Sequence, residues 1–445
     1  MPTNSALTGL VASLARTNMR PLVPLAAALA AAASLAGPLP ASASTYVRYG
    51  IQDDAWLRFG PGGTLEDRID ELDRLGVEVV RFTLDWRRIA PTRPVNARDP
   101  DDPAYDWSSA DDLVQGLRRH GIEALLTLWG SPAWANGGRG ANWAPKNGAA
   151  FAAFATAAQD RYPWVRRWLI WNEPNKAPFL QPVSPRVYVR RLLNPAYDAL
   201  HAANPKAVVG AGVTGPQAGA GGMSPVDFIS GLGSEGAQLD AYAHNPYPAS
   251  PRETPWEGGC ARCETITMAT LERLLFWVDR ALGPKRIWLT EHGYQTNPPD
   301  PLFGVSPLRQ ATYIGSAALR AYLAARVDVL IQFLIRDDAE LGGWQSGLTY
   351  VTGKAKPSFD AFRLPLAQYE RDGRQTTLWG QVRPRAGPQP YRLQRLQGGI
   401  WRSLGGVQQT NAQGTFLRTV DAGLGARFRV WSPRDRAYSA VLVVT

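Results

Sequence analysis

The chain has 445 residues, of which 45% are hydrophobic and 19% are charged, and its formal net charge at pH 7 is +10. This composition is that of a folded globular protein, and the length allows two or three domains with large cores. The positive charge comes mostly from dispersed arginines without a nucleic-acid-binding motif, so we expect no nucleic-acid partner. An acidic glycan or a cell wall is the alternative to a basic surface that is merely solvated.

Residues 1–43 have the pattern of an export signal. Arg16 and Arg20 precede an apolar run over residues 21–37, and a small-x-small site follows at residues 41–43. The run is shorter than the roughly 20 apolar residues that a transmembrane helix needs. We predict a signal peptide cleaved near Ala43, and hence a secreted protein, extracellular or associated with the cell wall. An uncleaved anchor is the alternative, and Met19 is an alternative start.

From residue 46 to about residue 365, short apolar runs alternate with longer amphipathic stretches. The apolar runs predict eight β-strands, at residues 46–52, 77–84, 122–129, 165–172, 206–212, 238–244, 286–291 and 327–333. Helices are predicted near residues 64–75, 108–120, 147–160, 185–203, 225–234, 264–281, 307–326 and 357–363. Eight strand–helix units predict a closed (β/α)₈ TIM barrel over residues 46–365. A doubly wound open sheet is the competing fold, but no glycine-rich phosphate loop follows the first strand.

The pattern changes after about residue 368. Short alternating runs such as "YRLQR" and "FRVWS" are separated by Gly, Pro, Asn and Gln turns, and no helical period is apparent. This predicts a small antiparallel β-sandwich domain over residues 368–445. Glycan binding, attachment to a surface and packing support for the barrel all remain open as its role.

The only two cysteines are Cys260 and Cys263, in "GGCARCET". A zinc site needs four ligands and no second pair exists, so no metal is expected. A redox dithiol is an alternative, although this glycine-rich loop differs from a strand-to-helix turn. In a secreted chain we predict a local disulfide that pins the loop.

Glutamates end the fourth and the seventh predicted strands, in "WLIWNEPN" and "IWLTEHGY". Side chains alternate along a strand, so each glutamate is expected to be the last of an inward-facing row. The two rows are Leu169, Trp171 and Glu173, and Ile287, Leu289 and Glu291. Barrel enzymes hold their chemistry at the carboxyl ends of strands, where an unpaired buried carboxylate is costly. We therefore expect a shared cleft, with two solvated loop acids as the alternative.

These residues carry a family resemblance. "WNEPN" at the fourth strand and "LTEHGY" at the seventh resemble the retaining glycoside hydrolases of clan A, the 4/7 superfamily. "LTLWGSPAWA" at the third strand, with "GGWQSGLTY" and "KPSFDAF" after the eighth, looks most like family 39 and its relatives. Family 5, the cellulase-like enzymes, comes second. The resemblance covers about residues 46–365 and leaves the C-terminal domain out.

The resemblance implies that Glu173 is the general acid/base and Glu291 the nucleophile. In such enzymes the nucleophile stays ionised, whereas the acid has a raised pKa. Arg81 matches the basic residue beside the nucleophile, with a structural arginine as the alternative, and Asn172 matches the position that binds the sugar 2-hydroxyl. The other implied substrate-binding positions are His244 (alternatively a core histidine), Tyr247 or Tyr294 beside the nucleophile, Trp344 as a stacking platform and Trp129 in the cleft.

We therefore predict a secreted O-glycosyl hydrolase that cleaves β-linked O-glycosidic bonds of an oligo- or polysaccharide with retention. It is expected to act as a monomer without a metal or an organic cofactor. A catalytically inactive carbohydrate-binding barrel and a transglycosylase that uses the same cleft are the alternatives. The sugar, the linkage and the choice between endo and exo action do not follow from the sequence.

Overall fold

The structure is a computed structural model of the chain. It describes residues 44–445 except residues 45, 62, 261–262 and 384–386. The signal peptide predicted over residues 1–43 lies outside the described residues. Within them, no helix has both the length and the apolar character needed to cross a bilayer.

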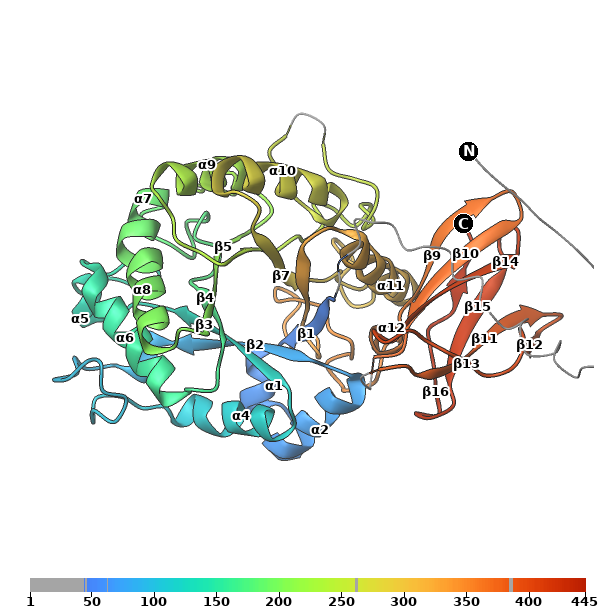
Figure 1. The fold of residues 1–445 in the computed structure, drawn as a ribbon, viewed down its shortest axis with the longest axis horizontal. Coiled ribbons are helices and arrows are strands. Elements are labelled where there is room, and N and C mark those ends of the chain that lie inside the picture. The colour runs from blue at the N-terminus through green and yellow to red at the C-terminus, as the bar shows by residue number, and fades with distance from the viewer. Residues whose placement is uncertain (1–43, 45, 62, 261–262, 384–386) are drawn as a thin grey trace, which may run out of the picture. The chain divides into compact units, whose positions relative to one another are not determined.

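Eight parallel strands close into a barrel, in which each strand pairs with the next along the chain and β8 pairs with β1 (Figure 1). The strands are β1 (Arg48–Gln52), β2 (Val79–Asp85), β3 (Glu123–Trp129), β4 (Arg167–Ile170), β5 (Val208–Thr214), β6 (Ala241–His244), β7 (Arg286–His292) and β8 (Val327–Phe333). The closed sheet confirms the predicted TIM barrel. The open doubly wound sheet is excluded.

Helices cover the outside of the barrel (Figure 1). They are α1 (Asp54–Phe59), α2 (Leu65–Leu75), α3 (Trp86–Ile89), α4 (Ser108–Arg119), α5 (Ala133–Asn136), α6 (Gly148–Arg161), α7 (Pro185–Tyr188), α8 (Asn194–Ala203), α9 (Pro225–Ser234), α10 (Leu271–Leu282), α11 (Pro307–Leu323) and α12 (Pro357–Arg363). A π-helical turn, Val189–Leu193, joins α7 to α8, and a 3₁₀ turn, Met268–Thr270, precedes α10. The capping box of Thr64 and Asp67 starts α2, and Ser306 caps α11 ahead of Pro307, where proline costs no hydrogen bond.

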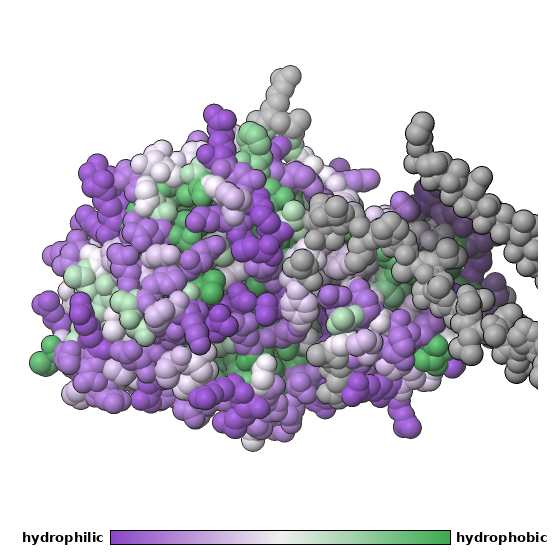
Figure 2. All heavy atoms as spheres, viewed as in Figure 1, coloured by the Kyte–Doolittle hydropathy of each residue, from purple (hydrophilic) through white to green (hydrophobic). Residues whose placement is uncertain are grey.

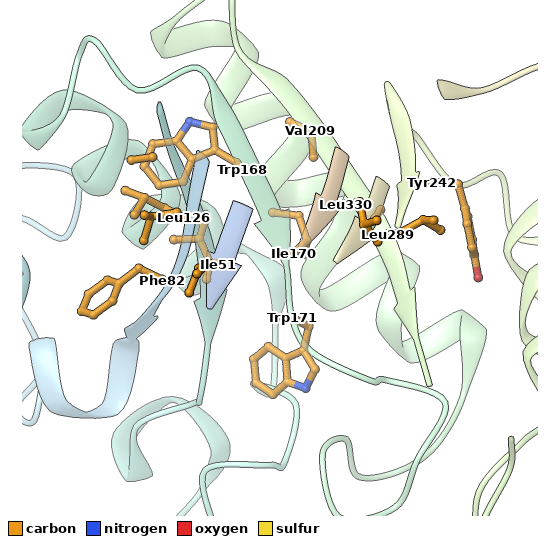
Figure 3. Close-up of a cluster of buried hydrophobic side chains, with 14 of the residues drawn as sticks. Ile51, Phe82, Leu126, Trp168, Ile170, Trp171, Val209, Tyr242, Leu289 and Leu330 are labelled. Carbon is orange, nitrogen blue, oxygen red and sulfur yellow. The ribbon is translucent and has the colours of Figure 1, made fainter. Parts of the chain in front are cut away.

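Two apolar layers hold the barrel together. A small cluster with members from seven strands fills the interior: Val79, Leu125, Leu169, Val213, Ala241, Ala243, Trp288, Val329 and Ile331. A larger cluster packs the other face of the strands against the helices, and Figure 3 shows part of it. Hydrophilic residues predominate on the barrel surface seen in Figure 2. The alternation of apolar residues along each strand accounts for both layers.

The chain continues from α12 into two antiparallel sheets, one of β14–β10–β9 and one of β12–β11–β15–β16, with β13 on β11 and β17 on β15. The strands are β9 (Leu366–Asp372), β10 (Gln375–Gln381), β11 (Pro390–Gln397), β12 (Ile400–Ser403), β13 (Gln408–Gln409), β14 (Thr415–Asp421), β15 (Arg427–Ser432), β16 (Ala437–Tyr438) and β17 (Leu442–Val443). Their inner faces share a second core, in which Tyr391 stacks on Phe416 at 4.0 Å. The predicted antiparallel β-domain after the barrel is confirmed.

The outer face of the β14–β10–β9 sheet packs on the barrel. Buried Trp379 of β10 lies 5.5 Å from Tyr322 of α11, measured between ring centres. A Cβ on Gly315 of α11 would lie 2.6 Å from the Leu366 carbonyl oxygen, so glycine lets the strand approach the helix. This contact fits the packing role considered for the domain, and it uses only one of the two outer sheet faces.

Candidate active site

Glu291 lies near the carboxyl end of β7, and its carboxylate is held from two sides. Arg81 of β2 donates from Nη1 to Oε1 at 2.6 Å, and the Tyr247 hydroxyl donates to Oε2 at 3.1 Å. Arg81 also donates from Nη2 to Asn172 Oδ1 at 2.8 Å and from Nε to Thr127 Oγ1 at 3.2 Å. With all its donating nitrogens engaged, the guanidinium fixes both the Glu291 carboxylate and the Asn172 side chain.

Burial raises the pKa of Glu291, Arg81 and the Tyr247 hydrogen bond oppose that effect, and the charge of Glu173 adds to it. The expectation that Glu291 stays ionised thus depends on Arg81 and Tyr247, because burial alone favours the neutral acid. Burial and the two carboxylates raise the pKa of Tyr247 well above its usual range. The phenol therefore remains a hydrogen-bond donor to Glu291.

Glu173 is the second buried carboxylate of the site, with 5% of the residue exposed. Its Oε1 accepts from Asn245 Nδ2 at 3.2 Å, and its Oε2 pairs with Lys176 Nζ at 2.9 Å. Thr290 Oγ1 donates to Asn245 Oδ1 at 2.8 Å, which orients the amide. A Cβ on Gly215 would lie 2.8 Å from Glu173 Oε1 and 2.4 Å from Lys176 Cε, so a side chain at this position would force the ion pair to shift.

Asn245 and Lys176 were not singled out from the sequence. Lys176 stands three residues after Glu173 in "NEPNK", and in a turn this spacing can return a side chain to the carboxylate. Asn245 follows directly on His244, in a segment already singled out. Neither signal distinguishes a site residue from a solvated one without the fold.

A turn of the backbone, and not the strand alternation, delivers Glu173. β4 ends at Ile170, and φ is 69° at Trp171 and 39° at Glu173, which is the left-handed region. Leu169 belongs to the interior as predicted, but Trp171 belongs to the outer layer, where its Nε1 donates to the Phe179 carbonyl at 2.7 Å (Figure 3). The predicted inward position of Trp171 is wrong because the strand ends at Ile170, two residues before its predicted end.

The alternation along β7 is also the reverse of the prediction. Ile287 and Leu289 lie in the outer layer, whereas Trp288 fills the interior. The pairing of β7 with β8 shifts register between Leu289 and His292. Such an irregularity re-aims a side chain, and here it brings Glu291 to Arg81.

His244 does not reach the carboxylates, which corrects its predicted place near the catalytic subsite. Its ring nitrogens lie 2.8 Å from Thr214 Oγ1 and 3.0 Å from the Ile266 carbonyl oxygen, and the residue is fully buried. Burial lowers its pKa to about 4, so it is a neutral core histidine. The next residue, Asn245, holds Glu173 instead.

The structure separates the two candidate tyrosines. Tyr247 contacts Glu291, whereas the buried Tyr294 hydroxyl has no hydrogen-bond partner among the described residues. Trp344 is 39% exposed, and its ring centre lies 4.7 Å from that of Tyr247 at 33°, so a partly exposed aromatic ring lies beside the tyrosine that contacts Glu291. Trp129 ends β3 half-buried, 5.9 Å from Trp171 between ring centres.

The predicted disulfide is absent, because Cys260 and Cys263 are both free. The Cys263 thiol faces the Cys260 carbonyl oxygen at 3.4 Å rather than the other sulfur. Arg273 donates to the carbonyl oxygens of Cys260 and Thr265, each at 2.8 Å. A guanidinium thus pins this loop in place of a covalent bond.

No family model matches the sequence, and no curated protein is similar to it in sequence. Solved structures of glycoside hydrolases share the fold. A family 39 glycoside hydrolase from the gut symbiont Bacteroides cellulosilyticus WH2 matches with a TM-score of 0.54 and 16% identity, covering 90% of this chain and 81% of that chain. The GH39 enzyme of Xanthomonas axonopodis pv. citri gives 0.54 and 14%, covering 86% and 93%, and a monomeric beta-xylosidase from Caulobacter crescentus CB15 gives 0.53 and 16%, covering 87% and 96%. The resemblance to family 39 stated from the motifs is thus matched by the folds of these neighbours.

Proposed function

We propose that the protein is a retaining glycoside hydrolase that cleaves β-linked O-glycosidic bonds of a glycan or glycoside. The observation that carries this proposal is the pair of buried glutamates, one after β4 and one near the end of β7 of a closed barrel, each held by its own donors. Glu291 is fixed by Arg81 and Tyr247, and Glu173 by Asn245 and Lys176. Two carboxylates in different environments are the requirement of double displacement.

In the first step a Glu291 oxygen bonds to the anomeric carbon while the glycosidic C–O bond breaks, and Glu173 gives its proton to the departing oxygen. In the second step Glu173 takes a proton from water, whose oxygen bonds to the anomeric carbon and releases Glu291. Lys176 pairs with the ionised Glu173 that the second step needs. In the first step the proton on Glu173 and the ammonium compete for the same carboxylate.

Two further side chains are suited to hold the sugar. Asn172, whose carbonyl is tied to Arg81, presents its amide N–H groups to a hydroxyl of the sugar. Trp344 offers a partly exposed aromatic face beside Tyr247. The export-signal pattern at residues 1–43 supports action outside the cell.

The test is Glu291→Ala, assayed on a panel of activated aryl β-glycosides and polysaccharides with product sizing. We expect hydrolysis to be lost. Release of the aryl group should return with azide, which attacks the anomeric carbon in place of the missing carboxylate and gives a glycosyl azide of inverted configuration. Glu340→Ala removes an exposed glutamate and serves as the matched control. Full activity of the Glu291 variant would refute the proposal. Calorimetric binding of a glycan by the wild type without any product would mean a non-catalytic barrel, and glycoside products formed with added alcohol would mean transglycosylation.

A further inference from the structure

A ladder of alternating aromatic rings and guanidinium groups crosses the outer face of the β12–β11–β15–β16 sheet. We call it the arginine–aromatic ladder, and its members are Arg392, Gln394, Trp401, Arg429, Trp431 and Tyr438. At its centre the Arg429 guanidinium lies between two rings, with Cζ 4.4 Å from the ring centre of Trp401 and 3.8 Å from that of Tyr438. Beside it, Arg392 lies over the Trp431 ring at 5.2 Å.

Strand register puts these side chains on one face. Arg392 pairs with Trp431 and Gln394 with Arg429 across β11 and β15, and Trp431 pairs with Tyr438 across β15 and β16. Directly paired residues in a sheet point to the same side. The other side of this sheet is the apolar core of the domain, so the ladder is on the side away from that core.

The ladder face is open among the described residues, whereas the outer face of the other sheet packs on the barrel through Trp379. Tyr438 is 41% exposed, and Arg392, Trp401, Arg429 and Trp431 are each partly exposed. The contacts of these rings and guanidinium groups are with one another. The side chains of the face are therefore held in place by one another, and their outer edge has no partner in the described part of the chain.

This sheet is strongly positive. Its strands carry five arginines and no acidic residue. Arg392, Arg427 and Arg429 alternate onto the ladder face, whereas Arg395 pairs with the core residue Phe428 and Arg402 pairs with Arg395, so these two are on the other side. None of the five forms an ion pair with a described residue, whereas Arg48, Arg161 and Arg286 of the barrel each pair with a nearby carboxylate. Among the described residues, Arg392 Nε is buried without a hydrogen-bond partner. Arg429 donates from Nε to Gln394 Oε1 at 2.8 Å, and its terminal nitrogens have no partner in that part of the chain.

We propose that the arginine–aromatic ladder is a second binding site, for a polysaccharide whose sugars carry carboxylates. A guanidinium held in plane by stacked rings presents its N–H edge to a carboxylate with little further ordering cost. The exposed ring edges and faces complement the apolar faces of sugar rings. A neutral chain would leave the unpaired charges without ligands, so the charge of the face selects an acidic polymer. The site would hold the barrel on its polymer, and it is independent of whether the barrel is catalytic.

The experiment measures binding of polygalacturonate to the full chain by titration calorimetry at about 0.15 M salt, where exposed charges are substantially screened. We expect binding by the wild type and by Glu291→Ala alike, and at least tenfold weaker binding by Arg392→Gln/Arg429→Gln. Arg374→Gln, which removes an exposed arginine at the end of β9–β10 that pairs with Asp421, is the control and should bind as the wild type does. Trp401→Ala keeps every charge and should also weaken binding, so the stacking is tested even where the double variant fails to fold.

Highly methyl-esterified polygalacturonate has the same backbone with neutral esters, and we expect it to bind at least tenfold more weakly than the free acid. The proposal is overturned where the wild type does not bind polygalacturonate, or where the ladder variants and Arg374→Gln lose affinity equally. Equal binding of the ester would also overturn it, as would binding only to phosphatidylglycerol vesicles, which would make the face a membrane contact. Because no arm requires turnover, these outcomes are separate from the activity of the barrel.

Discussion

Arg81→Met tests how Glu291, the proposed nucleophile, is kept ionised. The 2.6 Å pair of Arg81 with Glu291 is buried, with side-chain exposures of 1% and 9%. Arg81 is a main opponent of the burial that raises the pKa of Glu291, so its removal raises that pKa further. A nucleophile must be ionised, so the acid limb of the kcat/KM profile moves to higher pH.

The size of the effect follows from the lost contact. A hydrogen bond to a charged group contributes about 1.5–3 kcal/mol, and each 1.36 kcal/mol is about a factor of ten in an equilibrium. The ionised fraction of Glu291, and with it kcat/KM on an aryl glycoside, should therefore fall about 10- to 150-fold at a pH below the limb. Well above the limb the loss should be smaller, because Glu291 is then ionised in both proteins.

The assay is a full pH–rate profile for wild type, Arg81→Met and Arg81→Lys. Lysine keeps the charge but loses the planar fork that also holds Asn172 and Thr127, so its limb should lie between the other two. An acid limb that stays in place in Arg81→Met, with a loss that is the same at every pH, would refute the electrostatic argument. It would assign Arg81 to the packing of the barrel mouth alone.

Two other substitutions probe Glu173, the proposed acid/base, and the buried carboxyl group of Glu78. Gly215→Ala puts a Cβ 2.8 Å from Glu173 Oε1 and 2.4 Å from Lys176 Cε. A misplacement of about 1 Å can lower the rate about 100-fold, so we expect a fall of this size in kcat/KM with little change in melting temperature. Unchanged kinetics would contradict the argument from this close contact. Burial raises the pKa of Glu78 from its ordinary value of 4.5 to about 7, so between these values the folded state holds a proton that the unfolded state has lost. Stability should fall as pH rises through this window, and Glu78→Gln should remove that part of the slope in calorimetric scans at about pH 4.5 and about pH 7.5. A parallel slope in the variant would exclude Glu78 as its source.

The barrel could be predicted because its signal is repeated and local. Eight apolar runs separated by amphipathic segments predict the strand order directly, because parallel neighbouring strands must be joined by a crossover, which is usually a helix. The β-domain was predictable from its alternating runs for the same reason. Side-chain partners that depend on two distant segments, such as Asn245 with Glu173, are set by the closure of the barrel and leave no local trace.

The candidate site was found by motif, but the geometric argument for it was wrong in detail. Arg81 does contact both Glu291 and Asn172, the residue before Glu173, at the predicted strand ends, yet neither glutamate arrives by the simple alternation expected of it. His244 shows the same limit on a smaller scale. A difference of one residue at the end of a strand exchanges a core position for a site position.

The irregular backbone is concentrated where the carboxylates lie. Six described residues other than glycine have positive φ, and four of them are at the carboxyl ends of barrel strands: Trp171, Glu173, Val213 and Leu334. Such conformations cost about 1–3 kcal/mol each and persist only where surrounding contacts fix them. Those contacts are present, because the Glu173 N–H donates to the Val213 carbonyl at 3.0 Å and the Leu334 N–H to the Gln52 carbonyl at 2.9 Å.

A regular strand end would keep these backbone groups in the hydrogen bonds between strands, and its side chains would point to alternate faces of the sheet. Turning out of the strand at Trp171 sends a large ring into the outer layer and lets two consecutive polar residues, Asn172 and Glu173, face the barrel mouth together. Alternation cannot place neighbours on one side. The strained backbone thus allows one short segment to carry both Asn172, which contacts Arg81, and the carboxylate of Glu173.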